Sequence, residues 1–445
     1  MEPEPLVKRL LRPEVTSWVY LTVSVNNALY TVNAYVPSRP KAGNLPGRVL
    51  FLPSFAASLV TIELAWAHLV FQILQTLVFA RLGALTRRPA KVALVLNVAS
   101  WVALGLTIRH SLAAAHEVRD ALKSLNHPRR APRRLPVRVE RNVEYQRVAG
   151  KRLRLDVFRP VDPPAEGERR PAIVQVHGGG WTVGDKREQG VLLLRHLASE
   201  GWVGFNVNYR LSPGATFPDH LVDVKRAIAW VREHADDYGV DPGFVAVTGG
   251  SAGGHLTALA ALTANESELQ PGFEDADTRV QAAVPFYGVY DFTNRNKTWP
   301  DEVLSQFLEP IVMKAYLADE PERFAAASPM DWVDHHDAPP FLVLHGDRDT
   351  LAPVEDARDF VDRLRAASPE PVYYLELHGA QHAFDIFPSI RSRRVIEAVG
   401  HFLDGVHTAY LREGGVLVPE TVEEAVGAEI DTDALERPTG EPLQV

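Results

Sequence analysis

The stretch F-V-A-V-T-G-G-S-A-G, residues 244–253, decides the fold. It reads as a short buried strand over residues 244–248, followed at once by a G-x-S-x-G motif that opens a helix. A serine on so tight a turn has a strained backbone, and its neighbours are glycines because a side chain there would collide with adjacent elements. The motif predicts that Ser251 exposes its hydroxyl above a sheet edge, as a candidate nucleophile.

A serine hydroxyl is unreactive at neutral pH unless a histidine base and an orienting carboxylate accompany it. Two loops downstream offer both: H-G-D-R-D-T-L, which starts at His345, and H-G-A-Q-H-A-F, which starts at His378. We expect Asp349 as the acid rather than Asp347, because an aspartate directly after a glycine turn is suited to bonding its own loop. We expect His382 as the base rather than His378, because it lies deeper in its loop.

The run H-G-G-G-W, which starts at His177, follows the third predicted strand. Consecutive glycines let bare backbone N–H groups approach a substrate oxygen. We therefore expect Gly178 and Gly179, together with Ala252, to donate to the oxyanion of a tetrahedral intermediate. The loss of one such donor raises the activation free energy by roughly 3–4 kcal/mol. His177 is expected to shape the loop, and Trp181 to form a wall of the substrate pocket.

From residue 137 onward, short β-branched runs alternate with helical periods, the pattern of a mostly parallel sheet covered on both faces. The long segment 287–339, rich in aromatic residues, is expected to help form the substrate pocket. We predict eight strands, at residues 137–146, 153–158, 172–177, 203–208, 244–248, 280–286, 341–345 and 372–377. We predict helices at residues 221–234, 252–263, 354–367 and 390–403. The catalytic domain is expected to span residues 137–411, with an acidic, disordered tail at 412–445.

The segment before the sheet is the most apolar part of the chain. Between residues 49 and 80 the only charged residue is Glu63, and a second uncharged run covers residues 92–108. A membrane span needs roughly 20 residues, so a membrane-inserted helical hairpin is expected at residues 49–108. The alternative is a pair of buried helices that covers the catalytic domain as a lid. A polar segment, 1–48, is expected before the hairpin, and a basic helix or linker, 109–136, after it.

The positions of Lys and Arg around the hairpin favour, weakly, both chain ends on the cytoplasmic side. The chain is accordingly expected to be membrane-associated. A fragment starting near Val137 is expected to be soluble and to keep its catalytic groups.

Composition excludes several other classes of function. The 47 basic and 56 acidic residues give a net charge of −9, which does not favour binding to nucleic acid. The chain has no cysteine, hence no disulfide, thiolate metal site or cysteine nucleophile. His335, His336 and Asp337 lack a further ligand at standard spacing, so no metal and no cofactor is expected. Nothing in the sequence indicates an oligomeric state.

The ordered motifs resemble the hormone-sensitive-lipase-like group of α/β-hydrolases, bacterial carboxylesterases and lipases with an H-G-G-G motif. The matching stretches are H-G-G-G-W, N-Y-R-L-S-P at 208–213, G-V-D-P-G-F-V-A-V-T-G-G-S-A-G-G-H-L at 239–256, H-G-D-R-D-T-L-A-P at 345–353 and H-A-F at 382–384. The resemblance implies an α/β-hydrolase fold with Ser251 as nucleophile, Asp349 as acid and His382 as base. It also implies Gly178, Gly179 and Ala252 as oxyanion donors. Family members commonly have glycine where Ala383 stands, and a soluble cap where this chain has its apolar hairpin.

These observations predict a serine carboxylesterase or lipase that hydrolyses small-molecule or lipid esters through an acyl-enzyme. An amidase or arylformamidase on the same fold is the alternative, because H-G-G-G-W loops also occur in formamide hydrolases. A non-catalytic membrane adaptor with a hydrolase fold is the alternative of another class.

Overall fold

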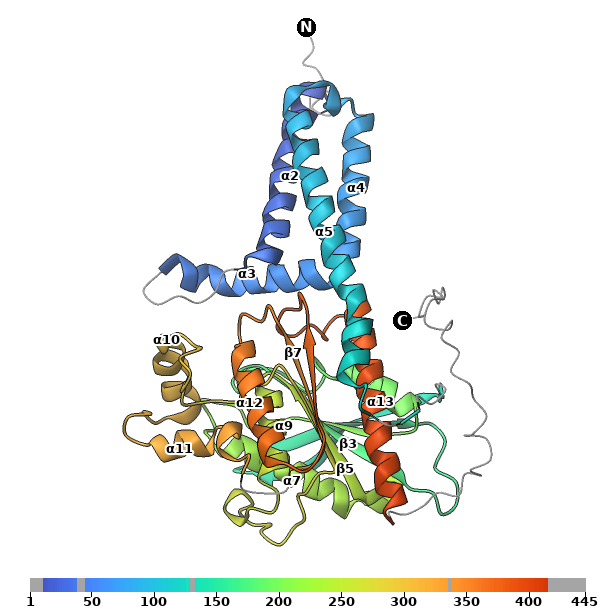
Figure 1. Cartoon of the computed structure of the whole chain (residues 1–445), viewed down its shortest axis with the longest axis vertical. Helices are drawn as coiled ribbons and strands as arrows, with labels where there is room; N and C mark the ends of the chain where they lie inside the picture. The colour runs from blue at the N-terminus through green and yellow to red at the C-terminus, as the bar shows by residue number, and fades with distance from the viewer. Residues whose placement is uncertain (1–10, 38–44, 126, 129–132, 335–337, 415–445) are drawn as a thin grey trace.

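One eight-stranded sheet carries the catalytic domain in the computed structural model, which describes residues 11–37, 45–125, 127–128, 133–334 and 338–414 (Figure 1). The strands are β1 (Val137–Val148), β2 (Lys151–Pro160), β3 (Arg170–Val176), β4 (Val203–Val207), β5 (Val240–Gly250), β6 (Ala282–Phe286), β7 (Phe341–Gly346) and β8 (Val372–Leu377). Their order is β1-β2-β4-β3-β5-β6-β7-β8. β2 is antiparallel to both neighbours, and the other pairs are parallel. All eight predicted strands are confirmed, and the fold is that of an α/β-hydrolase.

Helices cover both faces of the sheet because their apolar residues recur at helical spacing. In α7, for example, Leu221, Val224, Ile228 and Val231 are fully buried against the strands. One face carries α7 (Asp219–Glu233), α9 (Ala252–Leu262) and α12 (Val354–Ala367), and the other carries α6 (Val191–Ser199) and α13 (Ile390–Arg412). The four predicted helices correspond to α7, α9, α12 and α13. Two short pieces, α8 (Ala235–Tyr238) and η2 (Ser267–Leu269), complete this part of the domain.

The segment between β6 and β7 forms a small helical layer beside the catalytic edge of the sheet. It contains α10 (Asp301–Val303), η3 (Leu304–Met313), α11 (Pro321–Ala326) and η4 (Pro329–Asp331). Tyr290, Phe292 and Trp299 from this segment are buried in the core. Phe307 instead faces the glycine loop after β3, because a Cβ at Gly180 would lie 3.1 Å from its ring. This contact fits the predicted role of the segment beside the site.

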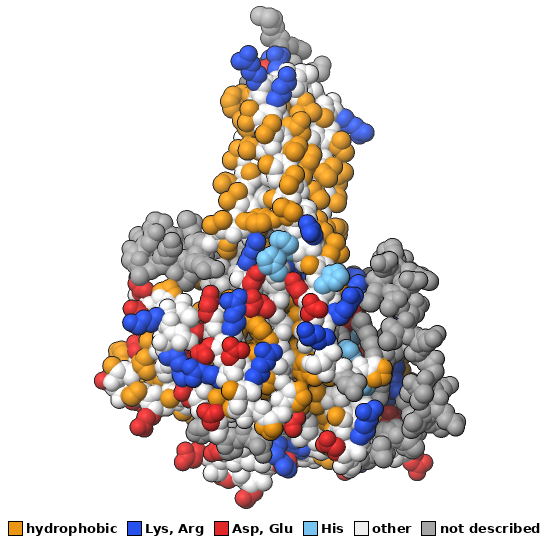
Figure 2. All heavy atoms as spheres, viewed as in Figure 1, with side chains coloured by type: hydrophobic (Ala, Val, Ile, Leu, Met, Phe, Trp, Pro, Cys, Tyr) orange, Lys and Arg blue, Asp and Glu red, His pale blue; other side chains and the backbone are white. Residues whose placement is uncertain are grey.

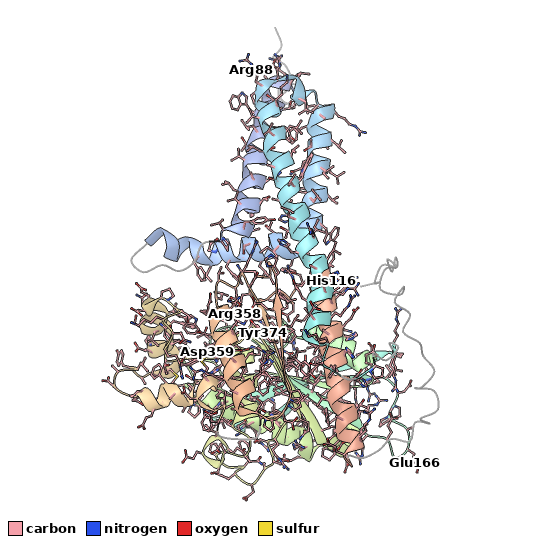
Figure 3. The ribbon with its side chains drawn as sticks, in the orientation of Figure 1. Arg88, His116, Glu166, Arg358, Asp359 and Tyr374 are labelled. Atoms are coloured by element: carbon pink, nitrogen blue, oxygen red, sulfur yellow. The ribbon has the colours of Figure 1, made fainter. Side chains whose placement is uncertain are left out.

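Three helices project away from the catalytic domain as a tall bundle (Figure 1). They are α2 (Pro13–Tyr35), α4 (Ala65–Arg81) and α5 (Arg88–Ala121), with η1 (Ala84–Thr86) at the tip between α4 and α5. We call α2, α4 and residues 88–108 of α5 the tower. Arg88 lies at its tip, and His116 lies where α5 reaches the catalytic domain (Figure 3). A further helix, α3 (Leu45–Glu63), lies across the base and meets α4 at an angle of 86°.

Two predicted boundaries at the N-terminal side are wrong. The segment 1–48, expected to be polar and separate, contains α2, which packs along α5 as the third helix of the tower. The boundary at residue 108 also does not divide the structure, because α5 continues without a break to Ala121. Its lower half packs on α13 and β8, where Ala114 and Leu122 are buried in the same core as the sheet. The acidic tail lies almost entirely outside the described residues.

The tower has its apolar side chains outside and its polar side chains inside. Figure 2 shows an apolar surface along the bundle, in contrast with the charged surface of the catalytic domain. Apolar side chains that are mostly exposed include Trp18, Leu29, Val32, Phe71, Leu74, Val78, Val92, Val95 and Val102. The buried seam of α5 repeats every three or four residues through Ala90, Ala93, Asn97, Ser100, Leu104 and Thr107. Such a seam of small and polar residues is typical of helices packed in a membrane.

Hydrogen bonds between the helices satisfy much of this polar interior. Asn97 donates from Nδ2 to the hydroxyls of Tyr20 at 2.9 Å and Ser24 at 3.0 Å, and Tyr20 shares a 2.8 Å hydrogen bond with Thr76. Because Tyr20 and Ser24 lie on α2 and Thr76 on α4, Asn97 links all three helices. Gln75 of α4 likewise accepts from Asn27 Nδ2 of α2 at 3.0 Å, so polar residues of the first apolar run take part in helix–helix contacts.

Candidate active site

Ser251 lies on a sharp turn between β5 and α9. Its φ of 58° and ψ of −121° are rare for a residue with a side chain, and strain of this kind concentrates at functional sites. Its N–H donates to the carbonyl oxygen of Phe286 on the neighbouring strand at 3.0 Å. The carbonyl oxygen of Ser251 accepts from the N–H of His255 at 2.9 Å, and this is the first hydrogen bond of α9. These bonds hold the turn, and the serine remains partly accessible.

The glycines around Ser251 are required by close packing, as the sequence predicts. A Cβ at Gly249 or at Gly253 would collide with the carbonyl oxygen of Val176 on β3. A Cβ at Gly178 would lie 3.0 Å from the Cβ of Ser251 and 2.6 Å from the carbonyl oxygen of Gly250. The glycine loop after β3 therefore lies directly against the candidate nucleophile.

The structure brings Asp349 and His382 together. His382 Nδ1 lies 2.6 Å from Asp349 Oδ2, and both side chains are almost completely buried. The other carboxylate oxygen, Oδ1, accepts from the N–H groups of Leu351 and Ala352, each at 2.8 Å. A carboxylate fixed in this way can hold the imidazole in one tautomer and one orientation.

The surroundings of Asp349 keep its carboxylate ionised. Burial would raise the pKa of this carboxyl, but the charge of His382 and hydrogen bonds from His345 and His382 outweigh burial, and the pKa lies well below its usual value. His345 Nε2 lies 3.3 Å from Asp349 Oδ2, the same oxygen that bonds His382 Nδ1. The acid is therefore charged throughout the neutral range.

The alternative candidates form a second, separate pair at the surface. His378 Nδ1 lies 2.6 Å from Asp347 Oδ2, and the His378 side chain is 56% exposed against 5% for His382. Asp347 also accepts from the N–H of Gly379 at 2.7 Å, so its carboxylate bonds the loop after β8, whereas it was expected to bond its own loop. Of the two Asp–His pairs, Asp349–His382 is the buried one.

Tyr287 connects the nucleophile turn with the base loop. A Cβ at Gly250 would lie 2.6 Å from its hydroxyl, and its ring centroid lies 4.6 Å from that of His382. The hydroxyl donates to Asp385, and burial raises the pKa of Tyr287, so it stays protonated. Tyr287 is a positioning residue. Its place directly after β6 was the one sign of this role in the sequence.

Gln381 is a second residue that the sequence analysis did not single out. Its Oε1 accepts from the N–H of Thr350 at 2.8 Å and from the N–H of His382 at 2.9 Å. Its Nε2 donates to Ser58 Oγ on α3 at 3.0 Å. Gln381 therefore ties the acid loop, the base loop and the helix at the base of the tower together. Its position beside His382 was the only sequence signal.

One predicted oxyanion donor is already engaged. The N–H of Gly178 donates to Gln189 Oε1 at 2.7 Å, so the assignment of Gly178 needs correction. Among the described residues, none accepts a hydrogen bond from the N–H of Gly179, Gly180 or Ala252. Gly179 has a φ of 116°, and a Cβ there would collide with the carbonyl of Val183, so only glycine fits.

Trp181 does not line an open pocket as predicted. Its side chain is 3% exposed and packs edge-on against His255 and Phe292, and its Nε1 donates to His255 Nδ1 at 3.2 Å. Burial lowers the pKa of His255 to about 3, so this histidine packs in the core as a neutral side chain. His177 bonds the carbonyl of Gly178 at 2.7 Å and stacks on Tyr209, so it shapes the loop as predicted.

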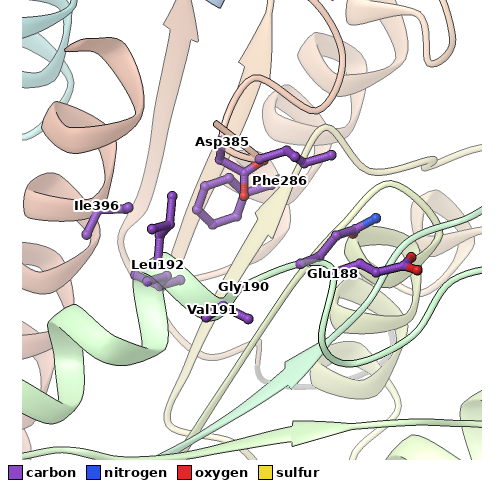
Figure 4. Close-up of a pocket in the computed structure, with 10 residues that line it drawn as sticks. Glu188, Gly190, Val191, Leu192, Phe286, Asp385 and Ile396 are labelled. Atoms are coloured by element: carbon purple, nitrogen blue, oxygen red, sulfur yellow. The ribbon is translucent and has the colours of Figure 1, made fainter. Parts of the chain in front are cut away.

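A small pocket lies beside these groups, between the start of α6, α13 and the loop after His382 (Figure 4). Two of its residues touch the site directly: Phe286 accepts from Ser251, and Gln189 accepts from Gly178. Its remaining lining is Glu188, Gly190, Val191, Leu192, Leu193, Asp385, Ile386 and Ile396. No cluster of three or more metal-ligating side chains occurs among the described residues, and His335, His336 and Asp337 lie outside them.

The end of α3 is anchored to the catalytic domain by a buried ion pair. Glu63 pairs with Arg391 at the start of α13 and accepts from Ser389 Oγ at 2.7 Å, and both charged side chains are fully buried. A fragment that begins near Val137 would lack Glu63 and the lower half of α5. It would leave Arg391 buried without this partner, which argues against the expectation of a soluble, independent fragment.

We expect Glu63→Ala to destabilise the protein by about 3–5 kcal/mol, because it leaves the Arg391 charge uncompensated. The measurement is thermal unfolding of the full chain in detergent. Glu14→Ala is the matched control, since Glu14 pairs with Arg87 at the tip of the tower with 58% and 51% of the side chains exposed. That change is expected to cost less than about 1 kcal/mol. Equal losses for both variants would contradict the anchoring role of Glu63.

Comparisons with known proteins agree with this geometry. Residues 155–364 match the family model BD-FAE. Esterase LipQ and the probable carboxylic ester hydrolase LipM, both from Mycobacterium tuberculosis, are each 50% identical over 258 residues. The aligned region is 58% of this chain and spans 60% and 59% of those relatives, less than two thirds of either.

The solved structures give the same result. A thermophilic esterase from Thermogutta terrifontis, Est2 with butyrate bound, matches with a TM-score of 0.51 and 27% identity, over 64% of this chain and 96% of that chain. Its butyrate-free form matches with a TM-score of 0.50 and 26% identity. Motifs, fold and relatives agree that the catalytic domain is similar to hormone-sensitive-lipase-like carboxylesterases with the α/β-hydrolase fold.

Proposed function

We propose that this chain is a membrane-anchored serine esterase that hydrolyses carboxylic esters through an acyl-enzyme. The buried Asp349–His382 pair, 2.6 Å apart and packed through Tyr287 against the turn that carries Ser251, is the observation that supports this most strongly. The names of the relatives, esterase and carboxylic ester hydrolase, favour esters over the formamides of an arylformamidase. The reaction requires no cofactor.

In the proposed mechanism, Ser251 Oγ attacks the ester carbonyl while His382 takes its proton. Asp349 stabilises the imidazolium that forms and does not itself accept the proton. The oxyanion is stabilised by the N–H of Ala252 and by those of Gly179 and Gly180, which replaces Gly178 in the predicted set. His382 then protonates the leaving alcohol. Water, activated by the same histidine, attacks the acyl-serine and releases the acid.

We further propose that the tower crosses the membrane. Among the described helices, α5 alone is long and apolar enough to cross a membrane by itself. The bent pair of α3 and α4 would add a second span if the pair counts as one. The stronger support is the inverted pattern of the tower, with apolar side chains outside and a polar seam inside. At 1.5 Å per residue, the 23 residues of α2 extend about 35 Å, enough for the roughly 30 Å of a bilayer core.

Three spanning helices change the predicted topology. α2 begins at the tip of the tower and the catalytic domain lies at its base, so the two lie on opposite sides of a membrane that the tower crosses (Figure 1). The expectation that both chain ends are cytoplasmic assumed a two-helix hairpin and is replaced by this arrangement.

One experiment tests nucleophile and location together. We expect the full chain to stay in the membrane pellet after washing with alkaline carbonate, because three apolar helices bury far more surface than a lipid anchor. The washed membranes should label with a fluorophosphonate probe and should hydrolyse a phenyl ester much faster than the matched formanilide. Recovery of most of the labelled protein in the carbonate supernatant would contradict the membrane-spanning tower. Faster hydrolysis of the formanilide would contradict the choice of esterase.

A further inference from the structure

Helix α3 lies between the tower and the catalytic edge of the sheet. It runs across the base of the tower, above the end of β7 and the loops that follow the strands (Figure 1). Asn33 near the end of α2 donates from Nδ2 to the carbonyl oxygen of Ser54 at 2.7 Å, which fixes α3 to the tower. If the tower crosses a bilayer, α3 lies at the bilayer surface, at the same level as the start of the catalytic domain.

The lower side of α3 touches the catalytic base directly. The ring of Phe55 lies edge-on to the imidazole of His382, with centroids 6.2 Å apart. One turn further, Ser58 accepts the hydrogen bond from Gln381. Since a helix is about 10 Å thick, His382 lies only about one helix diameter below the outer side of α3. The catalytic groups therefore face the membrane side of the domain.

The surroundings of this contact are apolar. No residue from 49 to 62 is charged, and Leu52, which is 64% exposed, Pro53 and Ala56 form the outer side of α3. The two loops that carry the acid and the base also expose one large apolar side chain each, Leu351 and Ile386. The acid loop touches the tower as well, because the guanidinium of Arg348 lies 4.8 Å from the ring centroid of Tyr35.

We propose that the substrate is an ester held in the same bilayer as the tower, which reaches Ser251 from the membrane side, beside α3, rather than from bulk water. The inference rests on the proposed esterase activity and adds the substrate class: an ester with at least one long apolar group. α3 then shields the ester bond while the apolar rim, Leu52, Leu351 and Ile386, contacts the hydrocarbon of the substrate. Ser251 Oγ displaces the alcohol, which leaves with the serine proton through His382. Water then breaks the bond between the acyl group and Ser251, so that its OH stays on the acid and its other proton returns to Ser251.

The test uses the full chain reconstituted in phosphatidylcholine vesicles, with active sites counted by fluorophosphonate labelling. A long-chain fluorescent diacylglycerol is placed either in the same vesicles as the protein or in separate vesicles, and p-nitrophenyl butyrate serves as the soluble ester. We expect hydrolysis of the diacylglycerol to be at least tenfold faster in the same vesicles, and its rate to follow the mole fraction of diacylglycerol in the bilayer.

The other outcomes distinguish a failure of membrane-side access from a failure of the proposed esterase activity. Hydrolysis of p-nitrophenyl butyrate with none of the diacylglycerol, or with equal rates in same and separate vesicles, overturns membrane-side access and leaves the esterase in place. Hydrolysis of neither ester overturns the proposed esterase, and this inference with it.

A pair of variants tests the apolar rim. We expect Leu52→Glu to lower the ratio of diacylglycerol to butyrate hydrolysis at least tenfold, because a carboxylate resists entry into the bilayer surface. Val161→Glu is the matched control, an exposed valine just after β2. Because β2 runs antiparallel to β4, Val161 lies at the edge of the sheet away from Ser251. The ratio of diacylglycerol to butyrate hydrolysis should therefore not change in Val161→Glu. An unchanged ratio in Leu52→Glu overturns the assignment of the rim.

Discussion

Ser251→Ala is expected to abolish ester hydrolysis, with a loss on the order of 10⁶ in turnover. Ser251 is the serine on the strained turn between β5 and α9, with a φ of 58°, and the proposed acyl-enzyme cannot form without its oxygen. Alanine fits the same position, because it only removes the hydroxyl, so the fold should be kept. The measurements are hydrolysis of p-nitrophenyl butyrate and labelling by a fluorophosphonate probe.

Ser267→Ala is the matched control for this loss. Ser267 is an exposed serine in η2, and its replacement should leave both hydrolysis and labelling at the level of the unmodified chain. Labelling of Ser251→Ala at the same level would mean that the probe reacts with another residue, and Ser251 would then not be the nucleophile. Partial activity would be equally inconsistent, since no neighbouring hydroxyl can take over on so constrained a turn.

The catalytic domain could be predicted from the sequence because its signals are local. The strands are short runs rich in apolar residues, and the G-x-S-x-G and H-G-G-G-W motifs lie directly at the ends of β5 and β3, at one edge of the sheet. The choice of Gly178 as a donor failed for a non-local reason. The side chain of Gln189, eleven residues later, takes its N–H, and no feature of the glycine run itself indicates this bond.

The tower was predicted only in part, because its inverted pattern lowers the average hydropathy of α2. Tyr20, Ser24, Asn27, Thr31 and Ala34 face the other helices at spacings of three and four residues. A search for apolar runs misses such a helix, whereas its heptad of polar and small residues could have revealed it. The ion pair that anchors α3 could not be predicted from the sequence, because Glu63 and Arg391 are 328 residues apart and neither lies in a local motif.

The second large effect distinguishes the two aspartates of the acid loop. Asp349→Asn is expected to lower turnover by about 10⁴, because an amide in place of the carboxylate favours the wrong tautomer of His382 and no longer stabilises its charge. Asp347→Asn should lower turnover less than tenfold. Its partner, His378, is mostly exposed, and its pair lies outside the buried site. Turnover of a soluble p-nitrophenyl ester, at matched thermal stability, is the measurement.

The two variants remove the same charge from positions two residues apart, so a general electrostatic effect would move both alike. Only a direct bond to the base predicts a large difference, because Asp349 Oδ2 lies 2.6 Å from His382 Nδ1 while Oδ1 is held by two backbone N–H groups. A larger loss of turnover in Asp347→Asn than in Asp349→Asn would show that the surface pair, Asp347 and His378, acts in catalysis. The base would then be His378, which lies beside His110 of α5, and the buried pair would have a structural role.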